Sequence, residues 1–170
     1  MAIIYGKESK KQPDEFGVLE RLSQLNDDYH VLCDVNVTLL NYVKYDGKKN
    51  LGSAQMDYII ISKKGVVLIQ AKDWSTIFEN QDNEVNPHEQ TDRAGRVLWM
   101  TLKPLNKTKN PHVTSVLIST QKTIKYDSKY KFVLVYDLKK INHLIKNRRE
   151  EFSEREVQRM VDSIKDDVTK

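Results

Sequence analysis

Two apolar runs joined by four polar or small residues constrain the fold of this chain more than any other feature. The runs are 56–61 and 66–71, and residues 62–65 (Ser-Lys-Lys-Gly) join them. Each run is rich in Ile and Val, which is typical of a buried strand. A short connection that contains glycine predicts that the two strands form a β-hairpin. The chain should therefore contain a β-sheet with this hairpin inside it.

The length of the hairpin loop decides which polar side chains face one another. With a two-residue loop at 63–64, Asp57 pairs directly with Gln70. Lys72 then lies on the same face of the sheet, two residues further on. With a three-residue loop, Asp57 faces away from Gln70 unless a second bulge corrects the register. Polar groups inside apolar strands are costly unless they are used, and the alternative is that both strands simply emerge into solvent here.

The residue types at this point suit phosphodiester hydrolysis, in which a metal ion activates water and neutralises developing charge. Mg²⁺ prefers oxygen ligands, usually one or two carboxylates with waters and phosphate. Asp57 would be the direct carboxylate ligand, and the side-chain oxygen of Gln70 and the backbone carbonyl of Ala71 would be neutral ligands. Lys72 would position or deprotonate the attacking water and stabilise the charge of the transition state.

A helix is predicted upstream of the hairpin, beginning at Pro13. Glu15 lies at the start of its apolar stripe, and an acid on the buried side of a helix should have a partner. If Glu15 points inward, it would bind the metal through water. The equally good alternative is an acid that interacts with the helix dipole at the solvated end of the stripe. The stripe consists of Val18, Leu19, Leu22 and Leu25.

A second helix is predicted to begin at Asn86, which can cap it, with Pro87 in the first position. Gln90 lies at the N-terminal end of the inner stripe and could contact substrate phosphate or the metal-bound water, or simply satisfy the backbone of the first turn. Arg93 is a candidate phosphate contact, although solvated helix charges are the commoner explanation. The inner stripe consists of Ala94, Val97, Leu98 and Thr101.

The remaining predicted elements are strands, helices and one loop. A capping box at Ser153 and Glu156 predicts an amphipathic C-terminal helix that packs on the domain or on a partner. The other predicted elements are a strand over 29–40, a loop over 44–54, strands over 113–119 and 131–136, and a short helix capped by Asp137 that continues to Ile145.

Charge and cysteine content narrow the class of protein. The net charge is +4, and residues 150–170 sum to −3 (four bases, seven acids), so residues 1–149 carry +7. A basic body suits a polyanionic partner, although ordinary solubility charge would explain the excess as well. The single cysteine, Cys33, permits no disulfide within the chain and fits a packed core thiol. No segment is long and apolar enough for a membrane span, so we expect a cytoplasmic protein.

Five separated strings, in order along residues 10–105, resemble the nuclease-related domain (NERD) family of the PD-(D/E)XK nuclease superfamily. The hairpin carries the strongest likeness, in the strings Gln-Met-Asp-Tyr-Ile (55–59) and Gly-Val-Val-Leu-Ile-Gln-Ala-Lys-Asp-Trp (65–74). The other similar strings are Glu15 with Val18 and Leu22, the stretch 25–32, and Asn86-Pro87 with Gln90.

This resemblance implies an α/β fold with a PD-(D/E)XK restriction-endonuclease-like core, in which helices flank a central mixed β-sheet. It also implies Mg²⁺ or Mn²⁺ as cofactor and hydrolysis of DNA, with RNA as an alternative, in DNA processing or defence. Gln55, at the start of the matched hairpin, becomes a candidate substrate contact. We expect the domain to span 1–149 and the C-terminal helix 150–170. A homodimer would suit an enzyme that cuts two strands.

One departure from the family pattern lies at the predicted site itself. The acid that usually stands two residues before the lysine is Gln70 here. The exchange removes one negative charge and should weaken the binding of Mg²⁺. The sequence therefore leaves two functions open: an active nuclease, or a nuclease-fold module that binds nucleic acid but cuts weakly or not at all.

Overall fold

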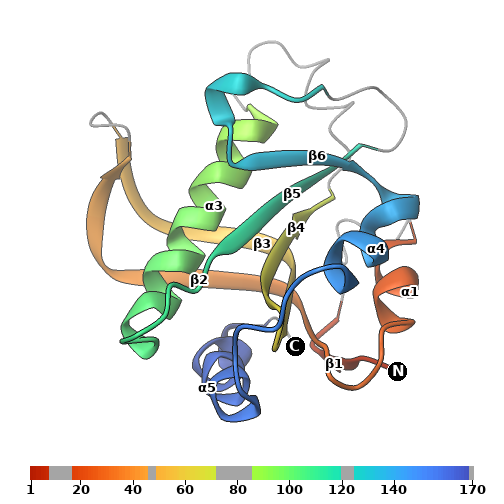
Figure 1. Cartoon of the computed structure of the whole chain (residues 1–170). Helices are drawn as coiled ribbons and strands as arrows, with labels where there is room; N and C mark the ends of the chain where they lie inside the picture. The colour runs from red at the N-terminus through yellow and green to blue at the C-terminus, as the bar shows by residue number, and fades with distance from the viewer. Residues whose placement is uncertain (8–16, 46–48, 72–85, 120–124, 169–170) are drawn as a thin grey trace.

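A six-stranded mixed sheet forms the centre of the computed structural model, and its strands lie side by side in the order of the chain (Figure 1). The structure describes residues 1–7, 17–45, 49–71, 86–119 and 125–168. The strands are β1 (Ile3–Tyr5), β2 (His30–Tyr45), β3 (Lys49–Ser62), β4 (Gly65–Gln70), β5 (Val113–Ser119) and β6 (Val133–Asp137).

The directions of the strands follow from their connections. Strands β2, β3 and β4 form an antiparallel meander, whereas β1 runs parallel to β2, and β5 and β6 run parallel to β4. A parallel pair needs a crossover, and α3 (Pro87–Leu102) lies between β4 and β5 in the chain. Every residue of β4 is buried, as expected for a central strand that is covered on both faces.

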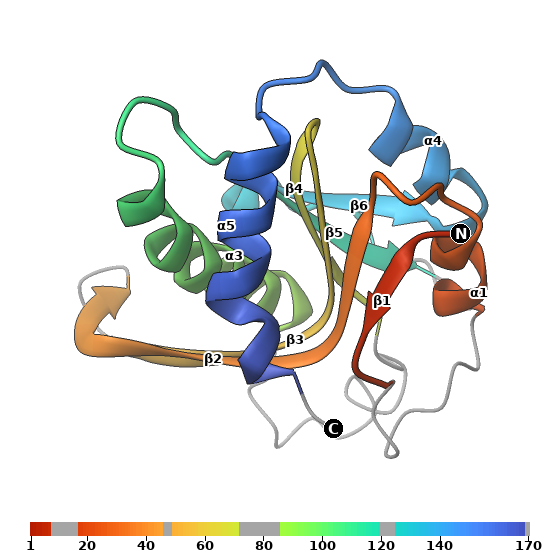
Figure 2. The same ribbon diagram turned by 90° about the horizontal axis from the view of Figure 1, so that it is seen from below.

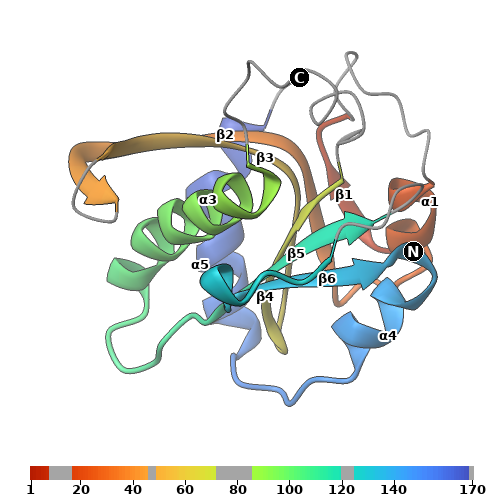
Figure 3. The same ribbon diagram turned by 90° about the horizontal axis from the view of Figure 1, so that it is seen from above.

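Helices cover both faces of the sheet (Figures 2 and 3). Helices α3 and α5 (Glu154–Ile164) pack into one hydrophobic core, and α1 (Val18–Ser23) and α4 (Ile141–Lys146) pack into a second core on the other side. None of the described helices is long and apolar enough to cross a lipid bilayer. Short 3₁₀ helices complete the structure: η1 (Lys103–Leu105), η2 (Ser128–Tyr130), η3 (Leu138–Lys140) and η4 (Lys165–Asp167).

The loop between β3 and β4 is the two-residue form. Ser62 pairs with Gly65 and Tyr58 pairs with Ile69, so the numbers of paired residues sum to 127. The φ angle of Gly65 is 115°, a conformation that residues with a side chain rarely adopt. Of the two registers that the sequence left open, the structure has the one that places Asp57 beside Gln70.

The predicted loop over 44–54 was wrong, because β2 continues to Tyr45 and β3 begins at Lys49. The far ends of these strands, residues 38–45 and 49–53, form a two-stranded ribbon that projects from the sheet (Figure 1); we call it the arm. Contacts with α3 hold the arm, because the Tyr45 hydroxyl donates a hydrogen bond of 2.6 Å to Asp92. These partners are far away in the sequence, so local patterns gave no sign of them.

The first described helix begins at Val18, and Gly17 before it has a φ of 70° in the left-handed region. The predicted start of this helix at Pro13 lies outside the described residues. Glu15, the predicted metal contact, lies outside the described residues.

Other sequence signals are confirmed by the structure. The Asn86 side chain caps α3 by accepting bonds from two backbone N–H groups, and Ser153 and Glu156 form the predicted capping box of α5. Cys33 is fully buried. The segment before α5 packs on the hairpin turn, where the Lys63 carbonyl accepts hydrogen bonds of 2.7 and 2.9 Å from the N–H groups of residues 151 and 152.

Candidate active site

Asp57 and Gln70 meet at the open end of the β3–β4 hairpin. The Asp57 N–H donates a hydrogen bond of 2.9 Å to Oε1 of Gln70. In return, Oδ2 of Asp57 accepts a 2.9 Å bond from the N–H of Ala71, the residue after Gln70. The end of β4 and an interior position of β3 are thus tied together by one side chain from each strand.

The Gln70 side chain joins β4 to β3 beyond the last backbone pair of the two strands. The ladder between the two backbones extends to the pair Tyr58–Ile69. At the next position, Oε1 of Gln70 accepts from Asp57, and Nε2 donates a 3.0 Å bond to the Gln55 carbonyl. Gln70 is only 2% exposed, and buried amides of this kind need partners at both ends.

Asp34 on β2 lies opposite Asp57, between the register pairs Cys33–Tyr58 and Val35–Met56. Its φ angle of 51° makes it the one non-glycine residue with positive φ in the described part of the chain. The Gln55 side-chain amide donates a hydrogen bond to the Asp34 carboxylate. The site therefore includes an acid from a third strand.

Asp34 was not among the predicted site residues. One signal was available, because this acid interrupts the apolar run of residues 31–35. An unpaired acid in a buried strand is costly, so such an interruption suggests a partner or a use.

The structure brings together four of the predicted site residues, Gln55, Asp57, Gln70 and Ala71, which lie on two adjacent strands. Lys72, which would complete the centre, falls outside the described residues. Gln90 lies in the first turn of α3 and is half-buried.

Arg93 is directed to the arm. Its guanidinium donates a 3.2 Å hydrogen bond to the Asn50 carbonyl and lies 5.5 Å from the centre of the Tyr45 ring. Arg96 lies over the same ring at 5.3 Å and is 3.9 Å from the Asp92 carboxylate. Burial, with the bond to Asp92, raises the pKa of the Tyr45 phenol, so it remains a neutral donor. The arm and α3 thus form a partly neutralised cationic surface.

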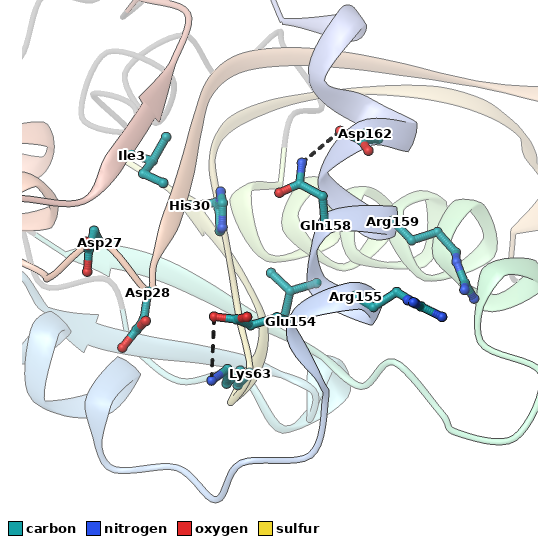
Figure 4. A pocket seen from close by; sticks show the side chains of 11 residues that line it. Ile3, Asp27, Asp28, His30, Lys63, Glu154, Arg155, Gln158, Arg159 and Asp162 are labelled. Atoms are coloured by element: carbon teal, nitrogen blue, oxygen red, sulfur yellow. Dashed lines mark hydrogen bonds and ion pairs between the residues drawn. The ribbon is translucent and has the colours of Figure 1, made fainter.

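A separate open pocket of about 820 Å³ lies between α5 and the strands β1 and β2 (Figure 4). Its charged side chains have both signs, and two pairs of its lining residues interact. Lys63 is 4.0 Å from Glu154, and Gln158 donates a 2.9 Å bond to Asp162. The four predicted residues of the hairpin end are not among its lining residues. We assign no chemistry to this pocket.

No group of three or more His, Cys, Asp or Glu side chains able to hold a metal ion occurs among the described residues. Asp57 supplies a carboxylate and Ala71 a backbone carbonyl at the hairpin end. Both are oxygen donors of the kind that Mg²⁺ prefers, and one carboxylate with water and substrate phosphate is a common Mg²⁺ environment.

Comparison with protein families supplies an independent finding. The family model of the nuclease-related domain matches residues 10–120 of the chain. The match extends from before α1 to just beyond β5, and it includes the whole β3–β4 hairpin. Searches of curated proteins and of solved structures returned no significant match.

Proposed function

The chain belongs to the nuclease-related domain family, as the sequence resemblance predicted, and we propose that it is a metal-dependent nuclease with its catalytic centre at the open end of the β3–β4 hairpin. The observation that carries the proposal is the contact between Asp57 and the Gln70–Ala71 segment at this point. The mixed sheet flanked by helices is compatible with a nuclease-like fold, and we propose that it is the PD-(D/E)XK core.

The proposed cofactor is Mg²⁺ or Mn²⁺, held by the Asp57 carboxylate and the Ala71 carbonyl together with substrate phosphate. A bound cation of this kind polarises the phosphate and lowers the pKa of coordinated water. We propose that Asp57 provides the main negative charge of the site, because a hard divalent cation favours carboxylate oxygen. Glu15 would add a contact through water.

Lys72 would act on the reacting groups themselves. Its ammonium group would orient the attacking water, accept its proton when neutral, and stabilise charge on the phosphate oxygens. For substrate binding we propose Gln55, which is exposed on β3, together with Gln90 and Arg93 on α3. The last two belong to the helix that faces the arm, where a phosphate backbone would meet positive charge.

DNA is the proposed substrate, and its phosphates match the charge of the chain. Residues 1–149 carry a net +7, whereas the segment after them is acidic. A basic body raises the affinity for polyanions and makes this affinity sensitive to salt. We propose a role in DNA processing or defence, with RNA as the alternative substrate.

A second candidate function is a module that binds nucleic acid without efficient cleavage. The observation that favours it is the state of Gln70, whose amide makes hydrogen bonds at both ends to the β3 backbone and brings no charge to the site. A site with one charged ligand fewer binds Mg²⁺ more weakly.

A cleavage assay separates these functions. Wild-type protein and the variants Asp57→Asn and Lys72→Ala would be incubated with linear, circular and single-stranded DNA in Mg²⁺, Mn²⁺ or EDTA. If the chain is a nuclease, wild-type cleavage should require the metal, and each variant should lose about 100-fold or more of the rate.

Lys107→Ala is the matched control, because Lys107 is exposed and lies outside the proposed site. It should cleave as the wild type does. DNA binding that falls with salt, without cleavage in any metal, would replace the nuclease with the binding module. Cleavage that persists in EDTA would reject the metal-dependent mechanism.

A further inference from the structure

The structure assigns Gln70 a role different from that of a metal ligand: we propose that its amide holds two backbone groups of β3 and thereby positions Asp57. This inference rests on the proposed function, because it concerns the same site. It makes Gln70 a positioning residue, which acts on the metal and substrate through Asp57.

The amide bonds to β3 in a way that one peptide group of a strand cannot. The N–H and C=O of a trans peptide group point to opposite sides of the strand, whereas the primary amide of glutamine can accept and donate on one side. Gln70 does both, at 2.9 Å from the Asp57 nitrogen and 3.0 Å to the Gln55 oxygen. The backbone pairing of β3 with β4 ends at Tyr58 and Ile69, so the side chain joins the two segments beyond the last pair.

These two bonds restrict what else the amide can do. The Nε2–Gln55 bond fixes the plane of the amide, and the Asp57 N–H takes one of the two acceptor positions of Oε1. If Oε1 turned toward a cation, the Asp57 N–H and the Gln55 carbonyl would both lose their partner. Gln70 is 2% exposed, so its place would not be filled readily by water.

The same bonds explain why an amide suits this position. A glutamate offers two acceptors and no donor, so its second oxygen would face the Gln55 carbonyl at the distance of a hydrogen bond. This oxygen–oxygen contact would be repulsive, and burial would disfavour the charged form. The replacement of the family's usual acid by Gln70 therefore adds a hydrogen-bond donor as well as removing a charge.

The link to Asp57 is reciprocal. Gln70 holds the backbone N–H of Asp57, and the Asp57 carboxylate holds the backbone N–H of Ala71. Fixing the end of β4 to β3 in this way sets the direction of the Asp57 carboxylate relative to the Ala71 carbonyl, the two proposed oxygen donors. A catalytic group must be held by its supporting contacts to keep productive geometry.

The variant Gln70→Glu distinguishes positioning from ligation, because the two roles predict opposite signs. A ligand position that regains its acid should bind Mn²⁺ more tightly, by about tenfold or more, and cut faster. A positioning residue that loses its donor should bind Mn²⁺ no more tightly, cut more slowly, and unfold about 5 °C or more below the wild type at pH 8. Calorimetric titration, cleavage rates and thermal unfolding would measure these three quantities.

A pH series adds a readout that ligation alone would not change. The introduced carboxyl would have a folded-state pKa above its unfolded value of about 4.3, because it is buried against a carbonyl. Its destabilising effect should therefore grow as the pH rises above about 4.3 and disappear at lower pH. When protonated, it can donate to the Gln55 carbonyl as the amide does. Gln24→Glu, at an exposed position on the end of α1, is the matched control and should show no such recovery.

Amide hydrogen exchange of the wild type keeps the test independent of any variant that fails to fold. If Gln70 is a positioning residue, the Asp57 N–H should stay protected when Mg²⁺ is added. Loss of this protection on metal binding, or a Gln70→Glu variant with tighter Mn²⁺ binding and unchanged stability, would overturn the proposal. If the wild type neither binds metal nor cuts, the nuclease proposal fails, and exchange together with the pH series still decides whether Gln70 holds the backbone of β3.

Discussion

The polar residues of the hairpin end and those of the α5 pocket differ in what they bind. At the hairpin end, the buried side chain of Gln70 and the partly buried side chain of Asp57 bond to backbone groups across the hairpin. In the pocket, exposed side chains bond to each other, as in the ion pair of Lys63 and Glu154. Lys63 and Glu154 are 36% and 83% exposed, so water competes for both.

The difference between backbone contacts and exposed side-chain contacts determines where polar groups contribute to stability and geometry. A backbone group buried within a sheet cannot move to find another partner, so losing its contact leaves it unsatisfied. An exposed charge that loses its partner is solvated again at little cost. We therefore expect the hairpin end to be sensitive to substitution and the pocket to be tolerant.

The largest effect should come from Asp57, whose two roles can be separated. Asp57→Ala removes the acceptor of the buried Ala71 N–H and should lower the free energy of unfolding by about 1–3 kcal/mol. Asp57→Asn keeps an oxygen acceptor and should lose less stability than Asp57→Ala, although both variants lose cleavage. Denaturant unfolding of both proteins would measure this, and equal losses would show that the backbone contact contributes nothing.

A smaller effect should appear at His30, which lines the pocket and contacts the Tyr5 hydroxyl at 3.0 Å. Burial lowers the pKa of His30, and the nearby Asp162 acts weakly in the opposite direction. The unfolded state therefore binds a proton more readily below pH about 6.5, and this residue should reduce stability as the pH falls.

The comparison with His30→Gln isolates this contribution, because other titrating groups are shared by both proteins. Melting temperatures measured from pH 7.5 to 5.5 should fall more steeply for the wild type than for the variant. Parallel curves would mean that His30 titrates alike in the folded and unfolded states.

The smallest effect should come from the Lys63 side chain. Lys63→Gln removes the exposed ion pair with Glu154 and should change the free energy of unfolding by no more than about 0.5 kcal/mol. The carbonyl of the same residue keeps its two hydrogen bonds to the segment before α5. A loss above about 1 kcal/mol in urea unfolding would contradict the contrast between side-chain and backbone contacts.

The sequence was most informative where the determinants were local. The register that joins Asp57 and Gln70 follows from the length of one loop, and the caps of α3 and α5 follow from residues within one helical turn. The orientation of the Gln70 amide could not be predicted, because it depends on backbone groups of β3 that are thirteen and fifteen residues away.

The prediction of a loop where the arm lies was wrong for the same physical reason. Glycine and lysine favour a loop locally, and the strand forms there because Tyr45 packs against α3. At Gly52 an added Cβ would lie only 2.1 Å from the Tyr42 ring, so the glycine makes room for an aromatic partner. This pairing appears only when the register of β2 and β3 is known.

The docking of the C-terminal segment onto the Lys63 carbonyl bears on how the molecule is divided. The family match ends at residue 120, yet two N–H groups from residues 151 and 152 close the hairpin turn from outside that match. Helix α5 also shares a core with β2, β3 and α3. A fragment limited to the matched residues would leave this core open to water. The segment that matches the family is therefore shorter than the packed structure that contains it.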